Sequence, residues 1–348
     1  MHSILQEARR PDPALRPWCP AAAGHGIAAM IVPLSGYALK TLAPETAVTV
    51  DRSRCVRHRC TANRCTKCMD ICPLDTISWG QGGLHINTGT CTQCLACLSV
   101  CPTAALSSPG LSLPRLLSDL ADHPLPVLGC KGQPDTDAHA RLSCLGYLAH
   151  PEVMVLFALV FPDGLHINLT ACSECANSHI LDSVTAAHDR LKDIVPGHAV
   201  RLIQNREELE YQAPSLSRRQ FFTLFRERSA SAAAVMVGRL HDGAEQQPYG
   251  NKRVPAMRAL LLKAIEASPL ANYRVIRDQL FGKISFTSDC TRSKRCVGVC
   301  PTGAIQSSGA NGKLPVFDQT LCISCYSCQS FCRNRGVLVL DNNRTAFM

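Results

Sequence analysis

The sequence predicts an α+β protein in which two related cysteine-rich modules flank a central α/β domain with a parallel sheet. The chain has 348 residues, which is long enough for two or three domains, and 21 of them are cysteines. These cysteines fall in tight groups, and the pattern of the first group is repeated near the C-terminus. Between the two copies, strand-like and helix-like segments alternate, as in β/α units with parallel strands.

The cysteine groups divide the chain into five predicted segments. Residues 1–50 are rich in proline and alanine and are predicted to be irregular. Residues 51–110 are predicted to form the first module, and residues 124–212 the central domain. Residues 213–275 are predicted to form a basic connector that is helical in parts, and residues 280–348 the second module.

The cysteines are expected to bind metal in a reducing cytoplasm. The first 18 residues carry charges and prolines where a secretory signal needs an apolar core. The apolar stretch 21–39 contains His25, Pro33 and three glycines, so a membrane span is not expected there. Disulfide scaffolds, in contrast, are typical of short secreted chains.

The formal net charge of +9 does not by itself indicate nucleic-acid binding. An iron–sulfur centre held by four thiolates carries roughly two negative charges, so four such centres bring +9 to about +1. We therefore expect no nucleic-acid partner. The basic residues are expected to face buried anionic clusters and acidic docking proteins.

The first module contains two cysteine runs of one pattern. One is a complete C-x2-C-x2-C-x3-C-P run, and the other is nearly complete. The complete run consists of Cys91, Cys94, Cys97, Cys101 and Pro102, and the other of Cys65, Cys68, Cys72 and Pro73. Residues 74–88, between the runs, read as a hairpin that turns at Gly80–Gly83. With these runs the module resembles the bacterial ferredoxins that carry two [4Fe-4S] clusters.

The resemblance implies crossed ligand sets, in which the last cysteine of each run binds the other cluster. One [4Fe-4S] cluster then takes Cys72, Cys91, Cys94 and Cys97. The other takes Cys65, Cys68, Cys101 and either Cys55 or Cys60, because neither upstream spacing is the usual one. A pair of zinc knuckles is the alternative, and the complete run favours iron–sulfur.

The second module is similar to the first, so the whole chain resembles a polyferredoxin, but one ligand is replaced. Ser293 stands where the second cysteine of the run is expected. The resemblance implies a complete [4Fe-4S] site at Cys300, Cys322, Cys325 and Cys328. Cys290, Cys296 and Cys332 remain for the other site, which resembles the [3Fe-4S] site of seven-iron ferredoxins. A four-iron cluster with a non-cysteine ligand such as Ser293 and an empty site are the alternatives.

The central domain carries four cysteines at the ends of predicted strands. Cys130, Cys144, Cys172 and Cys175 are expected to converge, because ligands gather at the carboxyl ends of parallel strands. The layout is similar to the delta subunit of methyl-viologen-reducing hydrogenase, which implies an additional [2Fe-2S] or [4Fe-4S] cluster. Structural zinc is the alternative, and a redox dithiol at Cys172 and Cys175 is a third interpretation.

The predicted function is electron transfer without a catalytic site of its own. No dinucleotide-binding, P-loop or zinc-protease motif occurs. The expected partners are a redox donor and a redox acceptor, for example a flavoprotein or a metalloenzyme subunit. The alternative is an oxidoreductase whose central domain reduces a disulfide or a small molecule. Residues 215–228, with five large apolar side chains and several arginines close together, predict either packing on the core or a peripheral membrane contact.

Overall fold

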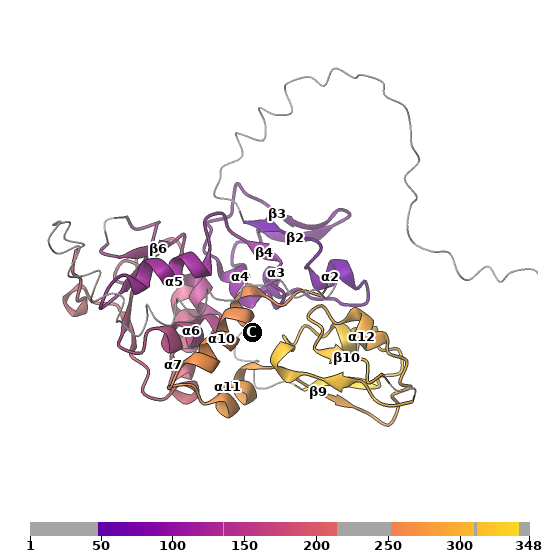
Figure 1. The fold of residues 1–348 in the computed structure, drawn as a ribbon. Coiled ribbons are helices and arrows are strands. Elements are labelled where there is room, and N and C mark those ends of the chain that lie inside the picture. The colour runs from indigo at the N-terminus through magenta and orange to yellow at the C-terminus, as the bar shows by residue number, and fades with distance from the viewer. Residues whose placement is uncertain (1–47, 135, 214–251, 310–311, 341–348) are drawn as a thin grey trace, which may run out of the picture. The chain divides into compact units, whose positions relative to one another are not determined.

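The computed structural model describes residues 48–134, 136–213, 252–309 and 312–340 (Figure 1). Most of the predicted irregular segment 1–50, the first part of the connector and the stretch 215–228 lie outside the described residues.

The first module is built from two short antiparallel strand pairs and three short helices. Strand β1 (Thr49–Val50) pairs with β4 (Leu106–Ser107), and β2 (Ile77–Gly80) pairs with β3 (Gly83–Ile86). The predicted hairpin is confirmed, with Gly80 opposite Gly83 and a φ of +98° at Gly83. Glycine adopts this conformation without the steric cost of a Cβ atom. The helices are α2 (Val56–Arg59), α3 (Lys67–Asp70) and α4 (Ala96–Val100).

The second module repeats this arrangement. Its outer strands β9 (Lys283–Phe286) and β12 (Val337–Leu340) pair antiparallel, as do its inner strands β10 (Ile305–Gln306) and β11 (Val316–Phe317). Its helices are α12 (Arg295–Val299), the 3₁₀ turn η3 (Gln319–Leu321) and α13 (Ser327–Phe331). In both modules the first strand pairs with the last, and the two middle strands pair with each other. This common pairing matches the repeat in the sequence.

The central domain holds a parallel sheet of four strands, as the sequence predicts. The strand order is β6 (Ala140–Leu142), β5 (Val127–Cys130), β7 (Leu165–Asn168) and β8 (Val200–Ile203). All four residues of β5 and of β7 are buried, as expected for a parallel sheet covered on both faces. The domain also contains α5 (Leu113–Ala121), η1 (Leu145–Ala149), α6 (Pro151–Val160), α7 (Ile180–Ile194) and η2 (Arg206–Glu208).

Helix α6 lies at the centre of the largest hydrophobic core. Nine of its ten residues are buried. Helix α10 (Ala256–Ala267) packs against α6 through its buried side, which includes Leu261 and Ala264, and α11 (Tyr273–Leu280) follows it. The last part of the predicted connector thus contributes to the core of the central domain. Among the helices of the described ranges, none is long and apolar enough to cross a bilayer.

Candidate metal centres

The structure gathers four cysteines of the first module around Cys68. Burial, together with the neighbouring thiolates of Cys101, Cys65 and Cys55, raises the pKa of the Cys68 thiol to about 12. Cys101 and Cys55 also raise the pKa of Cys65, although burial is the larger cause. Cys60 is buried but is not among the groups that shift these two pKa values most. Cys55 therefore lies close enough to Cys65 and Cys68 for its charge to raise their pKa values.

A second group surrounds Cys97. Burial raises the pKa of Cys97, followed by the thiolates of Cys94, Cys68, Cys91 and Cys72. Cys68 belongs to the first group, so the two groups of this module are neighbours, as the crossed ligand pattern requires.

Cys72 shows how this module stabilises a thiolate. Although its burial opposes ionisation, the hydroxyl of Thr76 lies 3.1 Å from its sulfur, and this hydrogen bond lowers the pKa of Cys72. Thr76 is 5% exposed, so little water competes for that contact. Hydrogen bonds to ligand sulfurs are among the factors that set the reduction potential of a cluster.

The second module contains one group of four cysteines and one group of three. Burial raises the pKa of Cys325 to about 12, and the thiolates of Cys300 and Cys322 contribute further. The same two thiolates, with Cys325, add to burial in raising the pKa of Cys328.

In the group of three, burial again dominates the raised pKa of Cys296, with Cys290 and Cys332 as its thiolate neighbours. The backbone N–H of Gly336 donates to the sulfur of Cys332 over 3.2 Å. This contact matches one in the first module, where the N–H of Ala105 donates to Cys101 over 3.3 Å.

The backbone around Ser293 has the same conformation as the loops around two predicted cysteine ligands. Left-handed residues with φ values of 56° and 62° flank Cys94, and left-handed residues with φ values of 48° and 61° flank Cys325. Arg292 and Lys294, with φ values of 56° and 57°, flank Ser293 in the same way. Such a conformation costs roughly 1–2 kcal/mol for each non-glycine residue. The loop therefore keeps a cluster-binding shape although serine has replaced the cysteine.

In the central domain the four predicted cysteines converge at the carboxyl ends of the strands. Cys130 ends β5, and Cys144 follows β6. Burial raises the pKa of Cys144 to about 12, with contributions from the thiolates of Cys130, Cys94 and Cys172. Burial also raises the pKa of Cys172 to about 11, with contributions from Cys130 and Cys175.

This central group lies against the cysteine loop of the first module. A Cβ atom added to Gly146 would lie 2.2 Å from the backbone oxygen of Cys94, so only glycine permits this approach. Asn177 spans the same boundary, because its Nδ2 donates to the Thr92 carbonyl over 3.3 Å and lies 3.8 Å from the sulfur of Cys144.

The two modules also contact each other directly, through Asn63. The Asn63 side chain accepts a hydrogen bond from the backbone N–H of Cys65 and donates one to the backbone carbonyl of Cys325, each over 2.9 Å. A single buried amide thus joins the cysteine loop of one module to that of the other.

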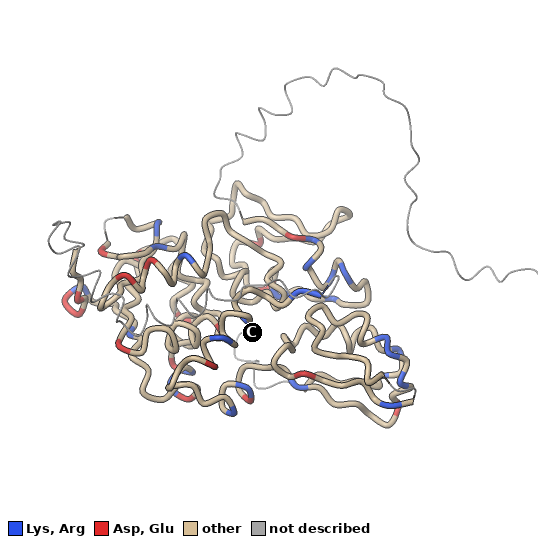
Figure 2. The backbone as a smooth tube through the Cα atoms, viewed as in Figure 1, with Lys and Arg blue, Asp and Glu red and all other residues tan. Residues whose placement is uncertain are grey.

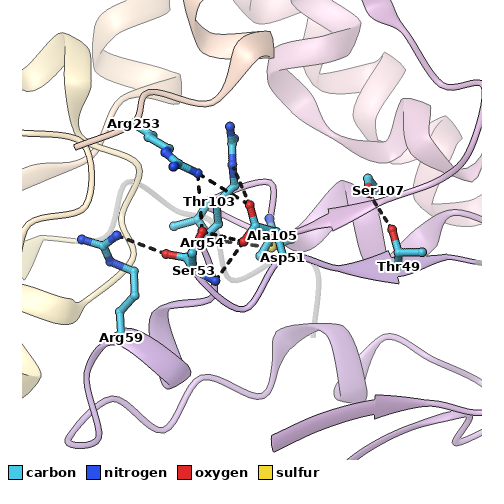
Figure 3. A network of polar contacts seen from close by, with 10 residues as sticks. Thr49, Asp51, Ser53, Arg54, Arg59, Thr103, Ala105, Ser107 and Arg253 are labelled. Carbon is cyan, nitrogen blue, oxygen red and sulfur yellow. Dashed lines mark hydrogen bonds and ion pairs between the residues drawn. The ribbon is translucent and has the colours of Figure 1, made fainter. Parts of the chain in front are cut away.

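Residues 252–253 reinforce this boundary. Lys252 donates to the carbonyls of Val297 and Gly298 over 2.8 and 2.7 Å, at the C-terminal end of α12, where a cation is favourable. The backbone N–H of Arg253 donates to the carbonyl of Pro301 over 2.8 Å. Its guanidinium reaches the first module, where it lies 3.4 Å from the Ser53 hydroxyl and 3.8 Å from the Asp51 carboxylate (Figure 3).

A buried ion pair connects the central domain to the second module. Arg258 on α10 is completely buried and lies 2.6 Å from Glu152 on α6. Its Nη1 also donates to the carbonyl of Cys322 over 3.0 Å. The guanidinium lies 4.2 Å from the ring centre of Phe281. Arg258 therefore anchors the loop that carries Cys322 to the core of the central domain.

The sequence analysis did not find Asn63, Gly146 or Arg258. None of them belongs to a motif, and each matters because of a residue that is distant in the sequence. Among the described residues, no group of three or more histidine, cysteine, aspartate or glutamate side chains is arranged to hold a single metal ion.

Two comparisons with protein families match the cysteine-rich modules. Residues 84–107 match a 4Fe-4S binding domain, and residues 283–333 match a 4Fe-4S dicluster domain. No curated protein and no solved structure matches the chain. The donor sets agree with this result, because both matched segments supply closely spaced thiols with hydrogen-bond donors at their sulfurs. The two matches show 4Fe-4S-type domains in two separate parts of the chain, and they support iron–sulfur binding and a role in electron transfer.

Proposed function

We propose that this protein relays single electrons between a redox donor and a redox acceptor in the cytoplasm. The electrons would pass along a row of cysteine groups in which each group neighbours the next. One observation carries the proposal: the central group contacts Cys94, the two groups of the first module meet at Cys68 and Cys97, and Asn63 joins Cys65 to Cys325. A row of neighbouring redox sites is what electron transfer through a protein requires.

The proposed ligand sets follow the crossed cysteine pattern, and the mutual effects of neighbouring thiols on their pKa values support them. Cys55, Cys65, Cys68 and Cys101 hold one [4Fe-4S] cluster, and Cys72, Cys91, Cys94 and Cys97 hold a second. Cys300, Cys322, Cys325 and Cys328 hold a third. Bound in these sites, a cluster supplies reversible one-electron chemistry. The protein contributes burial, hydrogen bonds to sulfur and the spacing between sites.

We assign a [3Fe-4S] cluster to Cys290, Cys296 and Cys332. Three thiolates suit a cluster that lacks one iron, and the unusual backbone around Ser293 is retained although its side chain is not a thiol. The serine position then faces the vacant corner.

We assign a further iron–sulfur cluster to Cys130, Cys144, Cys172 and Cys175. A tetrahedral zinc site with Zn–S bonds of about 2.3 Å needs its sulfurs roughly 3.8 Å apart. A multi-iron cluster spreads its ligands over a larger volume. The four thiols are neighbours at the carboxyl ends of the strands and lie beside the Cys94 loop of the first module, which supports a cluster in electronic contact with that module. This group lies against the first module's loop at Cys94, and in the proposed relay it forms one end of the row.

The proposal is tested by the metal content of anaerobically purified protein. Iron, acid-labile sulfide and zinc are measured together with EPR spectra before and after reduction with dithionite. Three four-iron clusters, one three-iron cluster and a central cluster correspond to about 17–19 irons per chain. Iron near 8 per chain together with stoichiometric zinc would contradict the relay, because the row of sites would be interrupted.

The three-iron assignment has its own test in Ser293→Cys. The oxidised three-iron EPR signal is expected to disappear as the site becomes a four-iron site, with one more iron per chain. Thr291→Cys is the matched control, because it adds a thiol to the same loop outside the ligand position. Loss of the signal in both variants, or its absence from the wild type, would contradict the assignment.

A further inference from the structure

The three-cysteine group lies beside a cavity that is larger than those beside two of the other cysteine groups. This cavity has a volume of about 190 Å³ and is lined by Cys290, Cys296 and Cys332. The cavities beside the groups of Cys97 and Cys328 each have a volume of only about 20 Å³. Cys290, Cys296 and Cys332 are each only partly buried, so a docked partner can approach this site closely, and short distance favours electron transfer.

Basic residues surround the mouth of this cavity. Five exposed cations lie in the two segments that form its wall, against one carboxylate, Asp289. Within the part of the chain that the structure describes, none of the five forms an ion pair. Figure 2 shows Lys and Arg gathered beside α12 with few acidic residues among them. We call these five residues the basic rim: Arg292, Lys294, Arg295, Arg333 and Arg335.

Cluster binding does not account for this charge. Arg292 and Lys294 occupy left-handed backbone positions on either side of Ser293. The equivalent positions of the other two loops hold the uncharged residues Gln93, Leu95, Ser324 and Tyr326. The same backbone is therefore made without cations elsewhere in this chain, and the basic rim serves another purpose.

We propose that an acidic one-electron carrier protein docks on the basic rim and exchanges electrons with the three-cysteine site. This inference rests on the proposed electron-transfer function and names one of its partners. Complementary charge steers association and raises its rate by about 10- to 1,000-fold. Transient redox complexes bury little surface, so a compact rim of five cations is sufficient.

An exposed apolar side chain lies next to the basic rim. Phe331, which precedes Cys332, is 43% exposed. Pro315 lies at the wall of the same cavity. A polar rim around a small apolar centre is typical of protein interfaces. Single-stranded nucleic acid, in contrast, is bound along an extended basic groove with several stacking aromatic side chains.

The test measures electron transfer from the reduced protein to an acidic flavodoxin by stopped flow over a range of salt concentrations. The charge-reversal variant is Arg292→Glu with Arg333→Glu. The matched control is Arg64→Glu with Lys67→Glu, which reverses two exposed cations beside Cys65 and changes the net charge equally. Iron content and EPR spectra establish that all three proteins carry the same clusters.

At low salt the rim variant is expected to transfer electrons at least tenfold more slowly than the wild type, and the difference is expected to vanish at high salt. The control is expected to change the rate about twofold or less. Equal slowing in both variants would overturn the proposal, because net charge alone would then explain it. Rim-dependent binding of single-stranded DNA with unchanged flavodoxin kinetics would overturn it in favour of nucleic acid. Absence of iron from the wild type would instead refute the electron-transfer function itself.

Discussion

The Asn63 side chain donates a hydrogen bond to the backbone carbonyl of Cys325 over 2.9 Å. The same amide accepts a hydrogen bond from Cys65 N–H and lies 3.2 Å from the Ser327 hydroxyl. Asn63 is only 3% exposed, so these contacts are shielded from water. They join the two modules at the loops that carry the proposed ligands, and in the proposed relay they set the distance between two redox sites.

We expect Asn63→Ala to weaken this contact without removing a cluster. The loss of buried hydrogen bonds is expected to lower the free energy of unfolding by about 1–3 kcal/mol. Electron equilibration between the modules, followed by pulse radiolysis, is expected to slow as their separation becomes less well defined. Asn87→Ala is the control, because Asn87 is exposed and its side chain accepts a hydrogen bond from the backbone N–H of Gly89 in its own loop. Identical transfer rates in the two variants would exclude Asn63 as the contact that sets this distance.

Gly146→Ala is expected to separate the central domain from the Cys94 loop. The added methyl group meets the Cys94 carbonyl at 2.2 Å, and such overpacking typically costs about 1–3 kcal/mol. Thermal unfolding and the magnetic interaction between the central cluster and its neighbour, seen by EPR, report the effect. Gly298→Ala is the matched control, because a Cβ atom at Gly298 meets nothing within 4 Å. An unchanged melting temperature in Gly146→Ala would show that the loop does not need this close approach.

Glu152→Gln is expected to destabilise the protein strongly. The substitution leaves the buried Arg258 guanidinium without its counter-ion, which costs about 3–5 kcal/mol. Chemical denaturation measures the loss. Asp189→Asn breaks an exposed ion pair with Lys192 and is expected to have no measurable effect. A similar small effect for both variants would mean that Arg258 is held by its carbonyl partners and Phe281 alone.

His139 makes the stability of the central domain dependent on pH. Its Nδ1 accepts a hydrogen bond from Val127 N–H over 2.9 Å, and its Nε2 lies 2.9 Å from the Gln212 carbonyl. Burial lowers the pKa of His139 below its usual 6.5, because the charged ring is poorly solvated. The unfolded chain then binds a proton before the folded chain does.

The contribution of His139 to stability is therefore complete above pH 6.5 and is lost as the pH falls through the lower, folded-state pKa. We expect the melting temperature to fall as the pH decreases from about 7 to about 5. His139→Asn, which does not titrate, is expected to show a smaller decrease over the same range. Equal slopes for the two proteins would show that His139 does not contribute to the pH dependence.

Local spacing explains what the sequence analysis predicted correctly. The β2–β3 hairpin follows from glycines between two short strand-like segments. The parallel sheet follows from buried strands that alternate with α6 and α7. The cysteine runs indicate iron–sulfur chemistry because three thiols a few residues apart can reach one cluster. Each of these features depends on interactions within a short length of chain, where backbone geometry limits the alternatives.

The amino-acid sequence by itself determined that this protein has two ferredoxin-type modules, a central parallel sheet and a serine in place of one cysteine. Only the tertiary structure brought Cys55 to its group, placed Asn63 against Cys325, set Gly146 against Cys94 and buried Arg258 beside Glu152. The physical reason is that these contacts join residues far apart in the chain. Their existence depends on how whole modules pack, which no local pattern of residues encodes.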